Sequence, residues 1–172
     1  MAKFSEIPQF TRMPNYQVNV PWDYVETWLG RRDTLVDPDF QRLHVWTEKQ
    51  QVAYVEYILR GGRNGRDLYF NQADWMNAFK APMYLVDGKQ RINAVLRFLH
   101  NELPIFDGLR IGDFEDSLGA LDAQFIIHVN NLKTYRAVVQ WYIEMNSGGT
   151  PHTEEEIDKA RALLNSAPSD KV

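Results

Sequence analysis

The sequence contains no cysteine among its 172 residues. This absence excludes a disulfide framework, a thiolate nucleophile and a cysteine-ligated zinc site, and it suits a reducing compartment. Long apolar runs are also missing. No stretch approaches the roughly 18 residues that a membrane-spanning helix needs, and the first residues lack the apolar centre of a secretory signal. We therefore expect a cytoplasmic protein with no membrane partner.

An excess of basic charge is missing as well. The chain has 19 Lys and Arg residues against 23 Asp and Glu, a formal net charge of −4. Such a balance gives no global field for tight, non-specific binding to nucleic acid, although a local basic patch stays open. Apolar residues make up 44% of the chain and aromatic residues 13%. This composition excludes a disordered chain, and the length corresponds to one domain with a core of its own.

The hydrophobic pattern predicts a single α+β domain over residues 1–172, with an irregular arm at 1–15 and a disordered tail at 166–172. Helices are predicted at 21–30, from 47 to the glycines at 61 and 62, from 88 to about 101, from 134 to about 145, and from 153 onward. Strands are predicted at 16–20, 68–70, 84–86, 103–106, 109–114 and 125–129. Residues 71–80 form a polar and aromatic insertion in which a helix is one alternative.

The most informative stretch is Asp87-Gly88-Lys89-Gln90-Arg91, where an apolar run meets an amphipathic one. We interpret it as strand, tight turn and helix. Free amides and the dipole at a helix N-terminus favour an anion, whereas Lys89 and Arg91 oppose that dipole. Both features predict a negatively charged ligand, and the simplest such ligand is a nucleotide phosphate with Mg²⁺. Asp87 would hold the metal or accept a proton. A well-formed turn without a ligand is the alternative.

Three further stretches carry candidate binding residues. Arg42 stands just ahead of the helix that Thr47 begins, either as a solvated charge or as a phosphate ligand. The segment at 146–151 is either a helix C-cap or a nest of amides that holds an anion. The glycine-rich loop after residue 60 is either a mobile connection or a basic edge that contacts nucleic-acid phosphates through Arg60, Arg63 and Arg66.

Three motifs in order resemble the DUF262 family, the N-terminal module of GmrSD-type restriction systems in the ParB/sulfiredoxin-like superfamily. The likeness covers roughly residues 16–165. Its motifs are Phe40-Gln41-Arg42 with Trp46, then Asp87-Gly88-Lys89-Gln90-Arg91, and last Asn146-Ser147-Gly148-Gly149-Thr150-Pro151 with Glu154. Each motif alone is weak, but the three in order are specific.

The resemblance implies a small mixed β-sheet flanked by helices, with a nucleotide pocket at the central turn and Mg²⁺-dependent NTP hydrolysis. It implies a catalytic role for Asp87, with Gln90 and Arg91 beside it. It further implies a phosphate-binding set drawn from all three motifs: Gln41, Arg42, Gly88, Lys89, Asn146, Gly148, Gly149 and Thr150. In such systems the hydrolysis is thought to gate a separate nuclease module in phage or bacterial DNA modification and defence.

Two residues depart from the family pattern, since Lys89 replaces a glutamine and His152 an apolar residue. The four histidines also lack the spacing of an H-N-H nuclease. We therefore predict an NTPase or phosphotransferase, with two alternatives. The first is a non-catalytic sensor that binds DNA, an effector or a host protein. The second is a DNA-nicking nuclease, which needs several converging carboxylates. The sequence does not predict the oligomeric state.

Overall fold

The computed structural model describes residues 2–8, 16–31, 33–41, 46–147 and 154–166. A five-stranded mixed sheet forms its centre, in the order β1-β5-β3-β4-β2. Its strands are Tyr16–Pro21 (β1), Thr34–Leu35 (β2), Asp67–Gln72 (β3), Met83–Asp87 (β4) and Gln124–Asn130 (β5). β3 runs parallel to β5 and antiparallel to β4, while β1 is antiparallel to β5 and β2 is parallel to β4. The sheet and its helices confirm the predicted α+β class.

Five α-helices surround this sheet in the described ranges: Val25–Gly30 (α1), Glu48–Leu59 (α2), Lys89–Leu99 (α3), Tyr135–Ser147 (α4) and Glu154–Ser166 (α5). The predicted capping box at the start of α2 is formed, because the Thr47 side chain accepts from the Gln50 amide and the Gln50 side chain accepts from the Thr47 amide. The Thr134 hydroxyl likewise accepts from the Ala137 amide at 3.2 Å, so it caps α4 as predicted. None of these helices is long and apolar enough to cross a lipid bilayer.

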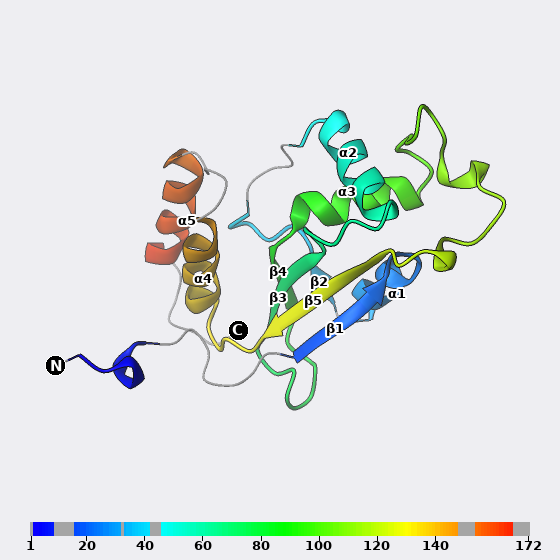
Figure 1. Ribbon diagram of the computed structural model, residues 1–172. Coiled ribbons are helices and arrows are strands. Elements are labelled where there is room, and N and C mark those ends of the chain that lie inside the picture. The colour runs from blue at the N-terminus through cyan, green and yellow to red at the C-terminus, as the bar shows by residue number, and fades with distance from the viewer. Residues whose placement is uncertain (1, 9–15, 32, 42–45, 148–153, 167–172) are drawn as a thin grey trace.

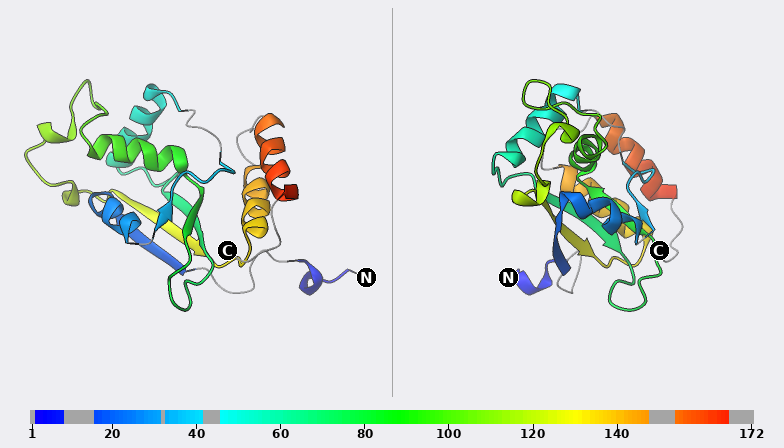
Figure 2. Two further views of the ribbon diagram at one scale, coloured as in Figure 1. Left: turned by 180° about the vertical axis from the view of Figure 1, so that it is seen from behind. Right: turned by 90° about the vertical axis from the view of Figure 1, so that its right-hand side faces the viewer.

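Two apolar layers hold the helices against opposite faces of the sheet (Figures 1 and 2). Side chains alternate along a strand, so β4 contributes to both layers. Met83 and Leu85 pack with α1, α2 and α3 in the larger layer. Val86 and Tyr84 pack with α4 and α5 in the smaller one. The strand that leads into the central turn is therefore fixed from both sides.

The structure excludes one alternative that the sequence left open and contradicts one prediction. Residues 73–78 form successive turns and no helix, and the loop is closed by the Lys80 amide, which donates to the Asp74 carboxylate at 2.7 Å. Residues 103–114 form no strand pair, only a bridge between Ile105 and Leu109 and a 3-10 turn at Ile111–Asp113. Phe106 has a positive φ of 44°, which interrupts an extended backbone. The short strand β2 was not predicted.

Candidate functional site

The central turn has the predicted strand–turn–helix geometry. β4 ends at Asp87, and Gly88 is the N-cap of α3, with φ of 110° and no side chain of its own to cap the helix. A Cβ on Gly88 would lie 2.2 Å from Cδ2 of the buried Leu68. The left-handed φ and the contact with Leu68 are sufficient to require glycine here. Glycine at this position is therefore explained by packing and says nothing about a phosphate.

Arg91 joins the turn to two strands. Its guanidinium donates to the carboxylate of Asp87 on β4 and to the main-chain oxygen of Asp67 on β3. Arg91 lies four residues after Asp87, and the side chains of both residues are partly exposed. Solvent or a ligand can therefore reach both groups. The structure thus brings together the predicted carboxylate and the predicted phosphate-binding arginine.

Lys89 points away from that pair toward the segment after β2. Its side chain is 8% exposed, and its ammonium forms an ion pair with the carboxylate of Asp37, whose side chain is 69% exposed. Lysine is seldom buried without a charged partner, because removing an ammonium group from water is costly. The first turn of α3 therefore holds an enclosed cation whose partner carboxylate stands in solvent.

Gln90 contributes to the packing between α3 and the segment before α2. Its Oε1 accepts from the main-chain amide of Trp46 at 3.1 Å. The Trp46 carbonyl in turn accepts from Gln51, whose Oε1 accepts from Arg97 at 2.8 Å. These bonds fix the start of α2 against α3. The predicted contact of Gln90 with a ligand stays a prediction.

The first and third motifs are only partly described. Gln41 is buried, and its amide nitrogen donates to the main-chain oxygen of Leu85, so the first motif does lie beside β4. Asn146 lies near the end of α4, where its amide donates to the Tyr142 carbonyl at 2.7 Å. Four predicted phosphate-binding residues lie outside the described residues: Arg42, Gly148, Gly149 and Thr150.

The predicted arginine edge needs correction at one residue. Arg66 is 3% exposed and points into the fold, where it donates to the Gly62 carbonyl at 2.8 Å and pairs with Asp122 at 3.0 Å. Arg60 and Arg63 are exposed, and the Arg60 guanidinium lies 5.0 Å from the centre of the Phe106 ring.

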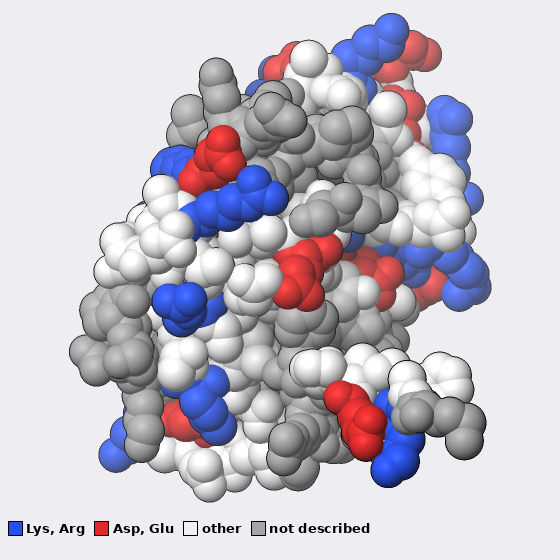
Figure 3. Space-filling model, turned by 90° about the vertical axis from the view of Figure 1, so that its left-hand side faces the viewer, with Lys and Arg blue, Asp and Glu red and all other residues white. Residues whose placement is uncertain are grey.

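On the face drawn in Figure 3, basic and acidic side chains are interspersed among the described residues, without an extended patch of either sign.

Sequence reasoning missed a polar group beside Arg91 on the sheet. Tyr69 of β3 pairs in register with Asp87 on one side and His128 on the other. The rings of Tyr69 and His128 stack at 4.7 Å, and His128 Nε2 lies 2.7 Å from the Asp67 carboxylate. Burial, with the charges of Asp67 and Asp87, raises the pKa of Tyr69. The only sequence signal was a histidine within an otherwise apolar strand.

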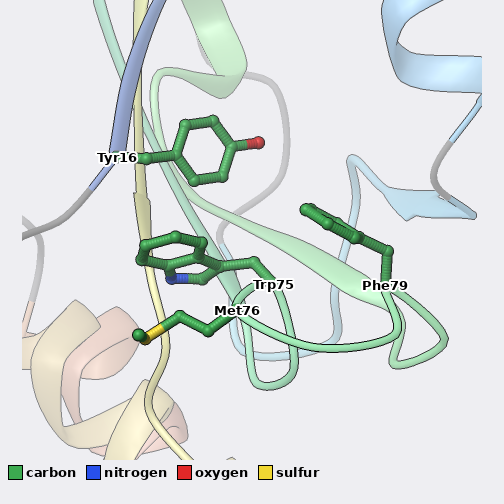
Figure 4. A pocket seen from close by; sticks show the side chains of 4 residues that line it. All are labelled: Tyr16, Trp75, Met76 and Phe79. Atoms are coloured by element: carbon green, nitrogen blue, oxygen red, sulfur yellow. The ribbon is translucent and has the colours of Figure 1, made fainter.

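Two hollows in the surface differ in chemistry. One, of about 560 Å³, lies between the segment after β2 and α5 and is lined by Asp37, Pro38, Asp39, Gln41, Lys159 and Leu163 among others. The second, of about 380 Å³, is lined by Tyr16, Trp75, Met76 and Phe79 (Figure 4). The aromatic lining of this second hollow suits an apolar group, whereas charged side chains line the first.

A metal site made by protein ligands alone does not occur in the described part of the chain, where no three His, Asp or Glu side chains cluster in a suitable way. Mg²⁺ is commonly held by one or two carboxylates together with substrate phosphates and water. Asp87, partly exposed at the end of β4, fits that mode of binding.

One comparison with known proteins gives a match. The family model described as the GmrSD restriction endonuclease N-terminal domain matches residues 25–124, more than half of the chain and including the central turn. No curated protein and no solved structure matches. The ParB/sulfiredoxin-like assignment therefore stays a prediction.

Proposed function

The chain belongs to the family of the GmrSD restriction endonuclease N-terminal domain, and this membership fits a module of a restriction system. From this premise we propose that the central turn of the chain binds a nucleoside triphosphate. Residues 87–91 would hold the phosphates with Mg²⁺ and support hydrolysis or transfer of the terminal phosphoryl group. The observation that carries the proposal is that one carboxylate and two cations, Asp87, Lys89 and Arg91, flank the N-terminus of α3.

Each charged group of the turn has a task in this reaction. Lys89 and Arg91 would bind phosphate oxygens and balance the charge that develops on them, which is the main contribution a protein makes to phosphoryl transfer. Asp87 would ligate Mg²⁺, which supplies Lewis-acid polarisation of the phosphate when bound, or would orient the attacking water. The main-chain amides at the start of α3 would add a partial positive charge that favours the phosphate.

Phosphate binding would require an exchange of partners. Lys89 is paired with Asp37 and Arg91 with Asp87, so each cation already has a carboxylate beside it. In each pair the carboxylate is the more exposed side chain, 69% for Asp37 and 31% for Asp87, so a phosphate can approach it. A phosphate that takes either cation replaces one anionic partner with another, and Arg91 also keeps its second bond to the Asp67 carbonyl.

The two alternative functions have less support. A DNA-binding edge retains Arg60 and Arg63 but not the buried Arg66. A nicking nuclease would need converging carboxylates, and the described ranges contain no cluster of three metal-ligating side chains. A sensor that binds a nucleotide without turnover uses the same turn as the enzyme, so only an assay of turnover separates the two.

Isothermal titration calorimetry with the Mg²⁺ complexes of ATP, CTP, GTP and UTP tests the proposal. We expect micromolar binding that Arg91→Ala abolishes and that the matched surface variant Arg63→Ala leaves intact. Because Arg91 also bonds to β3, urea unfolding of Arg91→Ala and Arg91→Lys would show whether a loss of binding reflects a loss of fold. Release of phosphate that stops in Asp87→Ala identifies an enzyme, and binding without release identifies a sensor. No heat with any nucleotide would contradict the proposal.

A further inference from the structure

The hollow of about 560 Å³ between the segment after β2 and α5 adjoins the central turn through one residue that belongs to both. Asp37 lines the hollow and also forms the ion pair with Lys89 in the first turn of α3. Gln41 lines it too and is bonded to the carbonyl of Leu85, two residues before Asp87. A molecule bound at the turn by its phosphates therefore has a hollow of ligand size next to it.

The lining of this hollow offers a hydrogen-bond acceptor. Its charged described residues are the carboxylates of Asp37 and Asp39 and the ammonium of Lys159, and Asp37 is already paired with Lys89. An ionised carboxylate only accepts hydrogen bonds. Asp39 would therefore attract N–H donors and repel a carbonyl edge. The part of a nucleotide that carries N–H donors is its base.

Asp39 is held in place within this lining. The Tyr135 hydroxyl donates to its Oδ1, and burial together with this hydrogen bond raises the pKa of Tyr135, which keeps the donor protonated. The Tyr135 ring is itself fixed against Phe40, with ring centres 5.8 Å apart. A carboxylate has about four acceptor sites on its two oxygens, so Asp39 retains capacity for a ligand.

We infer that this hollow is the base subsite of the nucleotide site, and that Asp39 selects guanine. The inference rests on the proposed function, because it requires the phosphates to bind at residues 87–91. Guanine presents N1–H and the 2-amino group side by side, and together they match the two oxygens of one carboxylate. Adenine and cytosine place an acceptor nitrogen beside their amino group, and uracil has a single N–H between two carbonyls. Each of these three would bring a lone pair against Asp39.

The same geometry gives a reversal test with xanthosine triphosphate. Xanthine has a carbonyl where guanine has its 2-amino group, and an asparagine side chain presents one acceptor and one donor to match it. Asp39→Asn should therefore weaken GTP binding and strengthen XTP binding. Asparagine keeps an oxygen for the Tyr135 hydroxyl, and urea unfolding checks that the variant is folded. Asp37→Asn is the matched control, because it changes the partner of Lys89 and should alter the affinity of all nucleotides alike.

The measurement is calorimetric titration of wild type, Asp39→Asn and Asp37→Asn with the Mg²⁺ complexes of GTP, ATP, CTP, UTP and XTP, and with inorganic tripolyphosphate. We expect wild type to bind GTP at least about tenfold more tightly than the other bases, and Asp39→Asn to favour XTP. Equal affinity for all bases, or an equal loss for all bases in Asp39→Asn, would overturn the base subsite and leave the phosphate site standing. No binding of any nucleotide or of tripolyphosphate would overturn both.

Discussion

Substitution of Gly88 by alanine should destabilise the protein both through the backbone and through a contact in the core. The residue has φ of 110°, and a non-glycine residue in the left-handed region loses about 1–2 kcal/mol. The new Cβ would also lie 2.2 Å from Cδ2 of Leu68, which is completely buried. Overpacking a core costs about 1–3 kcal/mol, so Gly88→Ala should lower the free energy of unfolding by about 2–5 kcal/mol.

Gly108 is the matched control for this experiment. It has nearly the same φ, 114°, but apart from its own chain neighbours no described residue comes within 4 Å of a Cβ built there. Gly108→Ala should therefore lose only the backbone contribution, about 1–2 kcal/mol. Urea unfolding followed by tryptophan fluorescence measures both variants. The double variant Gly88→Ala/Leu68→Ala should lose less than the sum of the single changes. Equal losses in Gly88→Ala and Gly108→Ala would refute the contact with Leu68 as the reason for glycine.

Three further predictions concern stability. Arg66→Ala should lower the free energy of unfolding by about 2–4 kcal/mol because its buried charge-assisted hydrogen bonds disappear, whereas Arg63→Ala should stay within about 0.5 kcal/mol in the same urea assay. Asn71→Ala should cost about 2–4 kcal/mol, because Asn71 is fully buried and bonds both the amide and the carbonyl of Leu132, and loss of less than 1 kcal/mol would count against that role. Burial raises the pKa of Tyr54 above the value of about 10 that it has in the unfolded chain. The unfolded chain therefore loses the Tyr54 proton first, and the free energy of unfolding falls as the pH rises above about 10. Tyr54→Phe has no such proton and should lose less stability than wild type between about pH 10 and 11.

Local signals allowed the sequence to predict the central turn. The Thr47 box, the stripe of α3 and the change from an apolar run to Asp87 and Gly88 each depend on neighbours a few residues apart. These rules describe short-range geometry, and the structure follows them. The turns at 73–78 were not predicted from the sequence. The hydrogen bond that closes them, from the Lys80 amide to the Asp74 carboxylate, leaves no periodic pattern of apolar residues.

Long-range pairing decided what the sequence did not predict. Arg66 is buried beside Asp122, which is 56 residues away in the sequence. The spacing of the arginines in the loop could not indicate this, so the sequence placed Arg66 on a basic edge with Arg60 and Arg63. Asp67 and His128 come together only because β3 pairs in parallel with β5. Strand order places Tyr69 between Asp87 on one side and His128 on the other, and no local motif encodes that order.

The position of the nucleotide on the fold tests the central claim most directly. Amide chemical-shift mapping by ¹H–¹⁵N NMR, with a Mg²⁺–nucleotide complex titrated into the labelled protein, reports that position residue by residue. We expect the largest changes at Gly88, Lys89 and Arg91, where the amides begin α3. Changes confined to the aromatic hollow around Trp75, or to the loop that contains Arg63, would contradict it.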